Sequence, residues 1–131
     1  MKAYCFFLGM LLLVTVVGCS SSESEDTIKI RSNLEGAGYT EQTELNSDHL
    51  FEQKLLNVKP IVYVNGDPQL TFYPLATPEE RERAMNQFIE KTVAYNIIDY
   101  DVYEDELHLF FFVHYDEELP LAGLTKLEGG I

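Results

Sequence analysis

The chain has 131 residues, 46% of them hydrophobic and 24% charged, which supports one globular domain with one core and excludes an intrinsically disordered chain. Its 22 acidic and nine basic residues give a formal net charge of −13. A field of that sign disfavours nucleic acid and anionic membrane surfaces as partners and favours cations or a basic protein. The plainer interpretation is that the charge keeps the domain soluble.

The first 26 residues predict an export signal and a tether. A single cation, Lys2, precedes an apolar run at 3–17, whose 15 residues are too few for a membrane-spanning helix but suit a signal peptide. A polar, acidic sequence (SSSESED) follows at 20–26. We therefore expect a signal peptide at 1–18, a flexible acidic tether within 19–26 and a single domain at 27–131.

The end of the apolar run, Val16-Val17-Gly18-Cys19, resembles the lipobox of bacterial lipoprotein precursors. The resemblance implies that cleavage follows Gly18 and that Cys19 receives a diacylglyceryl thioether, with further acylation, for example by palmitate. Val17 is larger than the residue usual at that position. Two or more acyl chains anchor a protein stably. The implied location is the extracytoplasmic face of the cell membrane, or the outer membrane of a host with two membranes; a plain signal peptide cut elsewhere is the alternative.

The cysteine count agrees with this interpretation. Cys5 lies inside the expected signal peptide, and Cys19 is the expected lipid attachment site; the chain has no other cysteine. The mature protein would then hold no free thiol, which excludes disulfides, thiolate metal sites and cysteine nucleophiles. Its stability would come from the core alone.

Hydrophobic periodicity and turn residues predict the elements of the domain in chain order. The segment at 50–59 fits neither a helical nor a strand period, and the tail from Glu117 predicts one short helix through Leu121, Leu124 and Leu127. The regular elements are a helix at 27–37, strands at 39–45, 61–64 and 69–73, a helix from 77 to about 95, and strands at 97–103 and 107–114.

Three local signals support these boundaries. Asn65-Gly66 predicts a turn between the strands at 61–64 and 69–73, because both residues tolerate positive φ, and Asp67-Pro68 extends that loop. Thr77, Pro78 and Glu80 predict a capped helix start. The last strand, LHLFFFVH, is apolar on both faces and predicts a central strand.

The second helix has a predicted buried face and a predicted exposed one. Its buried face includes Phe88, Ile89 and Val93, whereas Arg81 is expected to face water. The order α-β-β-β-α-β-β predicts an α+β domain, in which two helices pack against an antiparallel sheet of four to five strands.

The domain also resembles a family of small bacterial lipoproteins of unknown function. The likeness rests on VKPIVYVNG at 58–66, on QLTFY at 69–73, on the acidic-capped helix that follows, and on the leucine-rich strand with its acidic cluster at 107–118. It covers residues 34–127. The resemblance implies the fold and supplies no catalytic residues; Pro68 and Pro74 depart from the family pattern.

Metal binding has few candidate residues. His108 and His114 are separated by about 20 Å along one strand, so they do not share an ion, and His49 lies in a loop. The acidic residues at 99–106, called the acidic hairpin below, lack the EF-hand pattern. Tyr103 occupies a ligand position, and no glycine gives the bend. We expect a solvated turn and no metal; the alternative is a divalent cation bound by Asp99, Asp101 and Asp105.

No motif for catalysis is present: the sequence has neither Gly-x-Ser-x-Gly nor a phosphate-binding glycine loop. We therefore expect no enzymatic activity and no cofactor. The expected role is a membrane-anchored accessory or protein-interaction module, with Tyr100, Tyr103 and Tyr115 as an anchor patch for a basic protein. The alternatives are a domain that binds a small ligand or a divalent cation, and, third, a cell-envelope hydrolase.

Overall fold

The structure is a computed structural model that describes residues 23–93, 99–114 and 117–127. Gly18, Cys19 and residues 20–22 of the expected tether lie outside these residues. The described elements are α1 (Glu25–Gly36), β1 (Thr40–Gln42), the 3-10 helix η3 (Leu50–Glu52), β2 (Ile61–Val64), β3 (Gln69–Pro74), α2 (Pro78–Thr92), β4 (Tyr100–Glu104), β5 (His108–Val113) and β6 (Thr125–Leu127).

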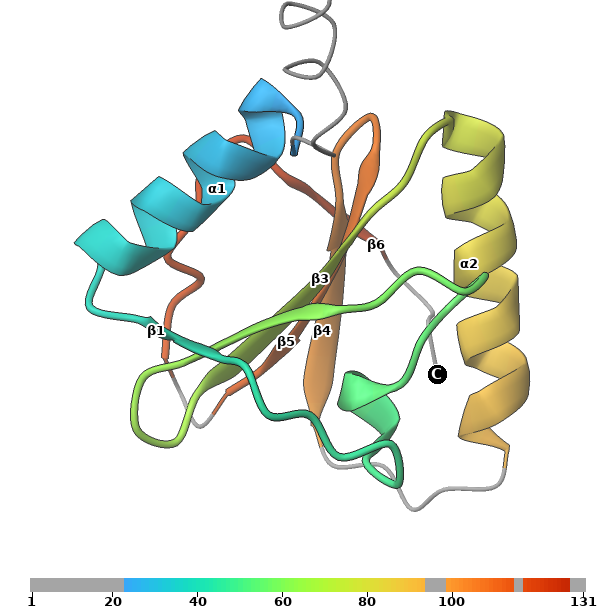
Figure 1. Ribbon diagram of the computed structural model, residues 1–131, viewed down its shortest axis with the longest axis horizontal. Coiled ribbons are helices and arrows are strands. Elements are labelled where there is room, and N and C mark those ends of the chain that lie inside the picture. The colour runs from blue at the N-terminus through green and yellow to red at the C-terminus, as the bar shows by residue number, and fades with distance from the viewer. Residues whose placement is uncertain (1–22, 94–98, 115–116, 128–131) are drawn as a thin grey trace, which may run out of the picture.

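The strands form one antiparallel sheet in the order β1-β2-β3-β5-β4-β6. The chain leaves β3 through α2, enters β4 two places along the sheet, and returns as β5 between β3 and β4 (Figure 1). The predicted α+β class is confirmed. The predicted strand at 39–45 is a shorter edge strand, and the sheet in the described residues has six strands rather than four to five.

The additional strand is β6, where the sequence predicted a short helix. Leu127 pairs with Val102, and Thr125 pairs with Glu104, at the outer edge of β4. Leucines three residues apart suggested a helical face, but Leu124 and Leu127 pack against clusters on opposite faces of the sheet. An unpaired edge of β4 would leave backbone N–H and C=O groups without partners, and β6 supplies those partners.

The sheet separates two apolar clusters, each covered by one helix. Figure 1 shows α1 on one face and α2 on the other. On the α1 face, Phe110 and Phe112 of β5 pack with Leu34, whereas on the α2 face Phe111 packs with Phe88. Every residue of β5 is buried, which confirms the predicted central strand and follows from the alternation of side chains along it.

Helix α2 begins as predicted and buries a narrower face than predicted. Thr77 is its N-cap, and Thr77 Oγ1 accepts a hydrogen bond from the Glu80 backbone N–H at 3.1 Å. Its buried residues are Ala84 and Phe88, which lie one turn apart. The prediction that Ile89 and Val93 are buried is wrong, because these side chains are 44% and 87% exposed. The reason is that only one narrow stripe of α2 meets the sheet.

Candidate functional site

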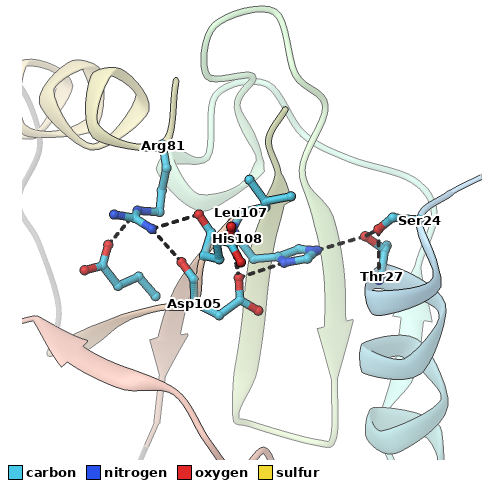
Figure 2. Close-up of polar contacts among 8 residues, drawn as sticks. Ser24, Thr27, Arg81, Asp105, Leu107 and His108 are labelled. Carbon is cyan, nitrogen blue, oxygen red and sulfur yellow. Dashed lines mark hydrogen bonds and ion pairs between the residues drawn. The ribbon is translucent and has the colours of Figure 1, made fainter. Parts of the chain in front are cut away.

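A chain of hydrogen bonds joins the start of α1 to the β4–β5 hairpin (Figure 2). The Ser24 and Thr27 hydroxyl oxygens lie 2.9 Å apart, and Thr27 Oγ1 lies 2.8 Å from His108 Nε2. His108 Nδ1 lies 2.9 Å from Asp105 Oδ1. Thr27 and His108 are only 1% and 2% exposed, so the middle of this chain is sealed from solvent.

Each member of the chain is held by its own element. Ser24 is the N-cap of α1, and its Oγ accepts the Thr27 backbone N–H at 3.2 Å. Asp105 lies in the hairpin turn, where Oδ1 also accepts the backbone N–H groups of Leu107 at 3.0 Å and His108 at 2.7 Å. The His108 ring lies about 6 Å from the rings of Phe72 and Phe110. The imidazole is therefore fixed by polar contacts at both nitrogens and by aromatic packing.

The donors and acceptors of the chain follow from this geometry. An ionised carboxylate only accepts hydrogen bonds, so His108 Nδ1–H donates to Asp105. When His108 is neutral, Nε2 accepts the Thr27 hydroxyl proton; when it is protonated, Nε2–H donates to the Thr27 oxygen instead. Partial burial raises the pKa of Asp105, but the hydrogen bond and charge of His108 and the two backbone N–H groups outweigh it, and the net pKa falls below its usual 3.8.

The order Thr27, His108, Asp105 matches the chemical order of nucleophile, base and orienting acid in hydrolases. The exposure of these groups argues against that use. A cavity of about 310 Å³ adjoins the hairpin and is lined in part by Asp105 and Leu107, whereas neither Thr27 nor His108 lines it. What the arrangement does in this molecule is fasten the first turn of α1 to the sheet.

Arg81 of α2 holds the same hairpin turn from the other face of the sheet (Figure 2). Its Nη1 donates to the carbonyl oxygens of Asp105 at 2.7 Å and Glu106 at 2.8 Å, and its Nε lies 2.7 Å from Glu104 Oε2. The prediction that Arg81 faces water is wrong, because its side chain is only 16% exposed. The carbonyl groups of a tight turn lack ladder partners, and the long guanidinium supplies donors for them.

Two of the three carboxylates considered for a cation have other partners. Asp101 Oδ2 lies 2.8 Å from His114 Nε2, and Asp101 Oδ1 lies 3.4 Å from Lys126 Nζ. Asp105 belongs to the His108 chain and lies in the turn beyond the end of β4, while Asp99 is exposed. In the part of the chain that the structure describes, no three histidine, cysteine or acidic side chains are grouped to hold a metal ion.

Two residues of the predicted tyrosine patch, Tyr100 and Tyr103, are packed against the core. Tyr100 is 7% exposed and packs in the α2-side cluster, with its ring 5.3 Å from that of Phe51 and 5.7 Å from that of Phe88. Tyr103 packs against the opposite cluster, because residues three apart on a strand point to opposite faces. Tyr115 lies outside the described residues. The first two tyrosines therefore do not share an exposed surface.

Sequence reasoning missed both the buried chain and a second cluster of polar groups. Thr27 and His108 are 81 positions apart in the sequence. Two local signals could have indicated them: the Ser24-x-x-Thr27 capping pattern, and a histidine close to a run of phenylalanines. The second cluster consists of Lys54, Lys59 and Lys91, which line one groove although no motif relates them.

Comparison of the chain with family models, with curated proteins and with solved structures finds no match. The resemblance to lipoproteins therefore remains a prediction from the sequence. None of the described helices has both the length and the apolar character needed to cross a membrane.

Proposed function

We propose that the protein is a lipoprotein anchored through Cys19 on the extracytoplasmic side of a membrane, where its domain serves as a non-catalytic interaction module. The observation that carries the proposal is the lipobox-like Val16-Val17-Gly18-Cys19, placed directly before a folded domain. Helix α1 begins at Glu25 with Ser24 as its cap, two residues earlier than predicted. Five residue steps from Cys19 to Ser24 span at most about 18 Å, so the domain would be held close to the bilayer.

The buried hydrogen-bond chain supports this role for the domain. A module pulled at its N-terminus by a short tether needs its first helix fastened to its core, and Thr27 and His108 make that connection directly after the N-cap. Because both groups are sealed from solvent, their hydrogen bonds keep their strength in a low-dielectric environment. The groups that would perform acid–base chemistry are thereby used for attachment.

The charge of the molecule supports a basic protein as the partner. The full chain has a net charge of −13, and its acidic residues all lie after residue 22, so the domain is repelled by anionic headgroups within a Debye length of about 8 Å and attracts a positively charged surface. Crosslinking in intact cells should yield a partner with a high isoelectric point, and raising the salt concentration before crosslinking should reduce the yield. A product with an acidic partner and no salt dependence would contradict this part of the proposal.

The anchor is tested by Cys19→Ala, with Cys5→Ala as the matched control inside the same signal sequence. In a bacterium that processes lipoproteins, the unmodified chain and Cys5→Ala should incorporate a labelled fatty acid and sediment with the membranes. Cys19→Ala should lose the label and leave the membrane fraction. A chain that remains membrane-bound without incorporating label, or a Cys19→Ala variant that is still labelled, would overturn the proposal.

A further inference from the structure

The basic side chains of the described residues divide into two groups. Arg31, Arg81, Arg83 and Lys126 each lie within 4 Å of a carboxylate oxygen. Lys29, Lys54, Lys59 and Lys91 have no such carboxylate among the residues that the structure describes, although acids outnumber bases by 22 to nine in the chain. Three of these four lysines line the same groove.

The groove lies between the segment that follows η3 and the side of α2; it is open to solvent and has a volume of about 670 Å³. Lys54 and Lys59 are exposed, whereas Lys91 is half-buried and donates from Nζ to the neutral amide oxygen of Gln53 at 3.1 Å. Glu52 also lines the groove, but it lies within 4 Å of none of these lysines. The three ammonium groups are therefore not neutralised by a described side chain.

The Glu52 carboxylate has hydrogen-bond and ion-pair partners other than the groove lysines. Its Oε1 accepts hydrogen bonds from Gln42 Nε2 at 2.6 Å and from the Asn46 backbone N–H at 3.1 Å, and its Oε2 lies 3.2 Å from His49 Nδ1. The Glu52 side chain is only 8% exposed. Its carboxylate thus fastens the loop before η3 and forms no ion pair with the three groove lysines.

A rigid turn fixes the spacing of Lys54 and Lys59. Leu55 and Val58 exchange two backbone hydrogen bonds of 3.1 and 2.8 Å, and between them Leu56 (φ 51°) and Asn57 (φ 63°) adopt the left-handed conformation. Two such residues in succession form a two-residue hairpin turn; asparagine tolerates this conformation, whereas for Leu56 it is costly. The Leu56 N–H donates to Gln87 Oε1 of α2 at 2.8 Å, which joins the turn to the helix across the groove.

We infer that this groove binds a small organic anion that carries at least two phosphate or carboxylate groups. Lys54, Lys59 and Lys91 provide three cationic donors for separate anionic groups, and Leu56 and Pro60 provide apolar contact for a carbon skeleton. The volume is in the range of small-molecule sites and exceeds what one inorganic anion would fill. The net negative charge of the molecule slows approach, but it is screened beyond about 8 Å at physiological salt.

The test is calorimetric titration of the full protein in a neutral detergent. The probes are fructose 1,6-bisphosphate for organic phosphates, citrate for carboxylates, and inorganic phosphate for a single anion. We expect binding of at least one organic probe, with a dissociation constant about tenfold below that of inorganic phosphate. Lys54→Gln and Lys59→Gln should each weaken that binding by about tenfold, the equivalent of one charge-assisted hydrogen bond.

Lys29→Gln is the matched control, because Lys29 also has no described carboxylate partner but lies on α1, outside this groove. It should leave binding of the organic probe unchanged. Hydrogen exchange of the unsubstituted protein gives a second measurement that needs no variant: the probe should slow exchange of the Leu56 amide and its neighbours. The proposal would be overturned if no organic probe bound, or if inorganic phosphate bound as tightly as the organic probes. It would also be overturned if Lys29→Gln weakened binding as much as the groove substitutions, or if the probe left hydrogen exchange at 53–59 unchanged.

Discussion

At the scale of single residues, His108 shows how a buried polar group can be accommodated in an apolar core. The ring is 2% exposed and lies beside Phe72 and Phe110, where an unpaired nitrogen would cost about 1–3 kcal/mol. Thr27 satisfies one nitrogen and Asp105 the other. Because the two partners come from α1 and from the hairpin turn, satisfying one side chain fixes the relative position of two elements.

The lowered pKa of Asp105 makes part of the stability depend on pH. Its folded-state pKa lies below the usual 3.8, so its contribution is fully present above about pH 3.8 and is lost as pH falls through the folded value. Asp105→Asn should lower the free energy of unfolding by about 1–3 kcal/mol at pH 5. The difference from the unsubstituted protein should shrink by pH 3. Urea unfolding at pH 5 and at pH 3 measures this difference, and Asp99→Asn, at an exposed position, is the control. A loss of stability in Asp105→Asn that is the same at both pH values would contradict a lowered pKa for Asp105.

At the scale of elements, α2 is joined to the sheet mainly through one side chain. The ring of Phe88 lies 4.1 Å from that of Phe111, between centroids, and 5.9 Å from that of Phe51 of η3. Ala84 is the other buried residue of the helix. Arg81 adds polar contacts at the first turn, so the helix is held at its start by hydrogen bonds and at its middle by aromatic packing.

Phe88→Ala should therefore destabilise the protein by about 3–5 kcal/mol, because it opens a cavity among aromatic rings. Ile89→Ala, at the adjacent position, should change stability by no more than about 0.5 kcal/mol, because that side chain is already 44% exposed. Thermal or urea unfolding of the two variants measures the contrast. Similar losses for both would show that the buried stripe of α2 is wider than the structure has it.

The contrast between Phe88 and Ile89 also shows how much of the fold can be predicted from the sequence. The Thr77 cap, the Asn65-Gly66 turn and the doubly apolar β5 are local signals, and the elements they predicted are present. The width of a helix face, the pairing of β6 and the partners of His108 depend on which elements meet, and no short window contains that information. The groove lysines were missed for this reason, since Lys91 is far from Lys54 and Lys59 in the chain.

At the scale of the whole molecule, an excess of negative charge surrounds a three-layer core. Two apolar clusters, one on each face of the sheet, are covered by a single helix each, with η3 and the tail leucines filling the remainder. Arginine and lysine side chains pair with Glu23, Glu41, Glu80, Asp101 and Glu104, so most of the acidic residues that the structure describes have no arginine or lysine partner there. The folded state therefore concentrates like charges that the unfolded chain would separate.

Added salt should consequently stabilise the protein. Raising NaCl from 10 mM to 500 mM screens the repulsion, and a gain of about 1 kcal/mol would raise the melting temperature by about 4 °C or more for a domain of this size. The paired surface charges weaken under the same conditions, but each contributes little. A fall in melting temperature would contradict the view that repulsion dominates.

Calcium separates screening from specific cation binding. At equal ionic strength, CaCl₂ and NaCl should give the same melting temperature, because Asp101 and Asp105 are each engaged by a histidine and the described residues contain no three-ligand cluster. Asp99→Asn and Asp101→Asn should then respond to both salts as the unsubstituted protein does. An additional rise in CaCl₂ that these two substitutions abolish would instead establish a cation site on the acidic hairpin, and it would require His114 to release Asp101 when the ion binds.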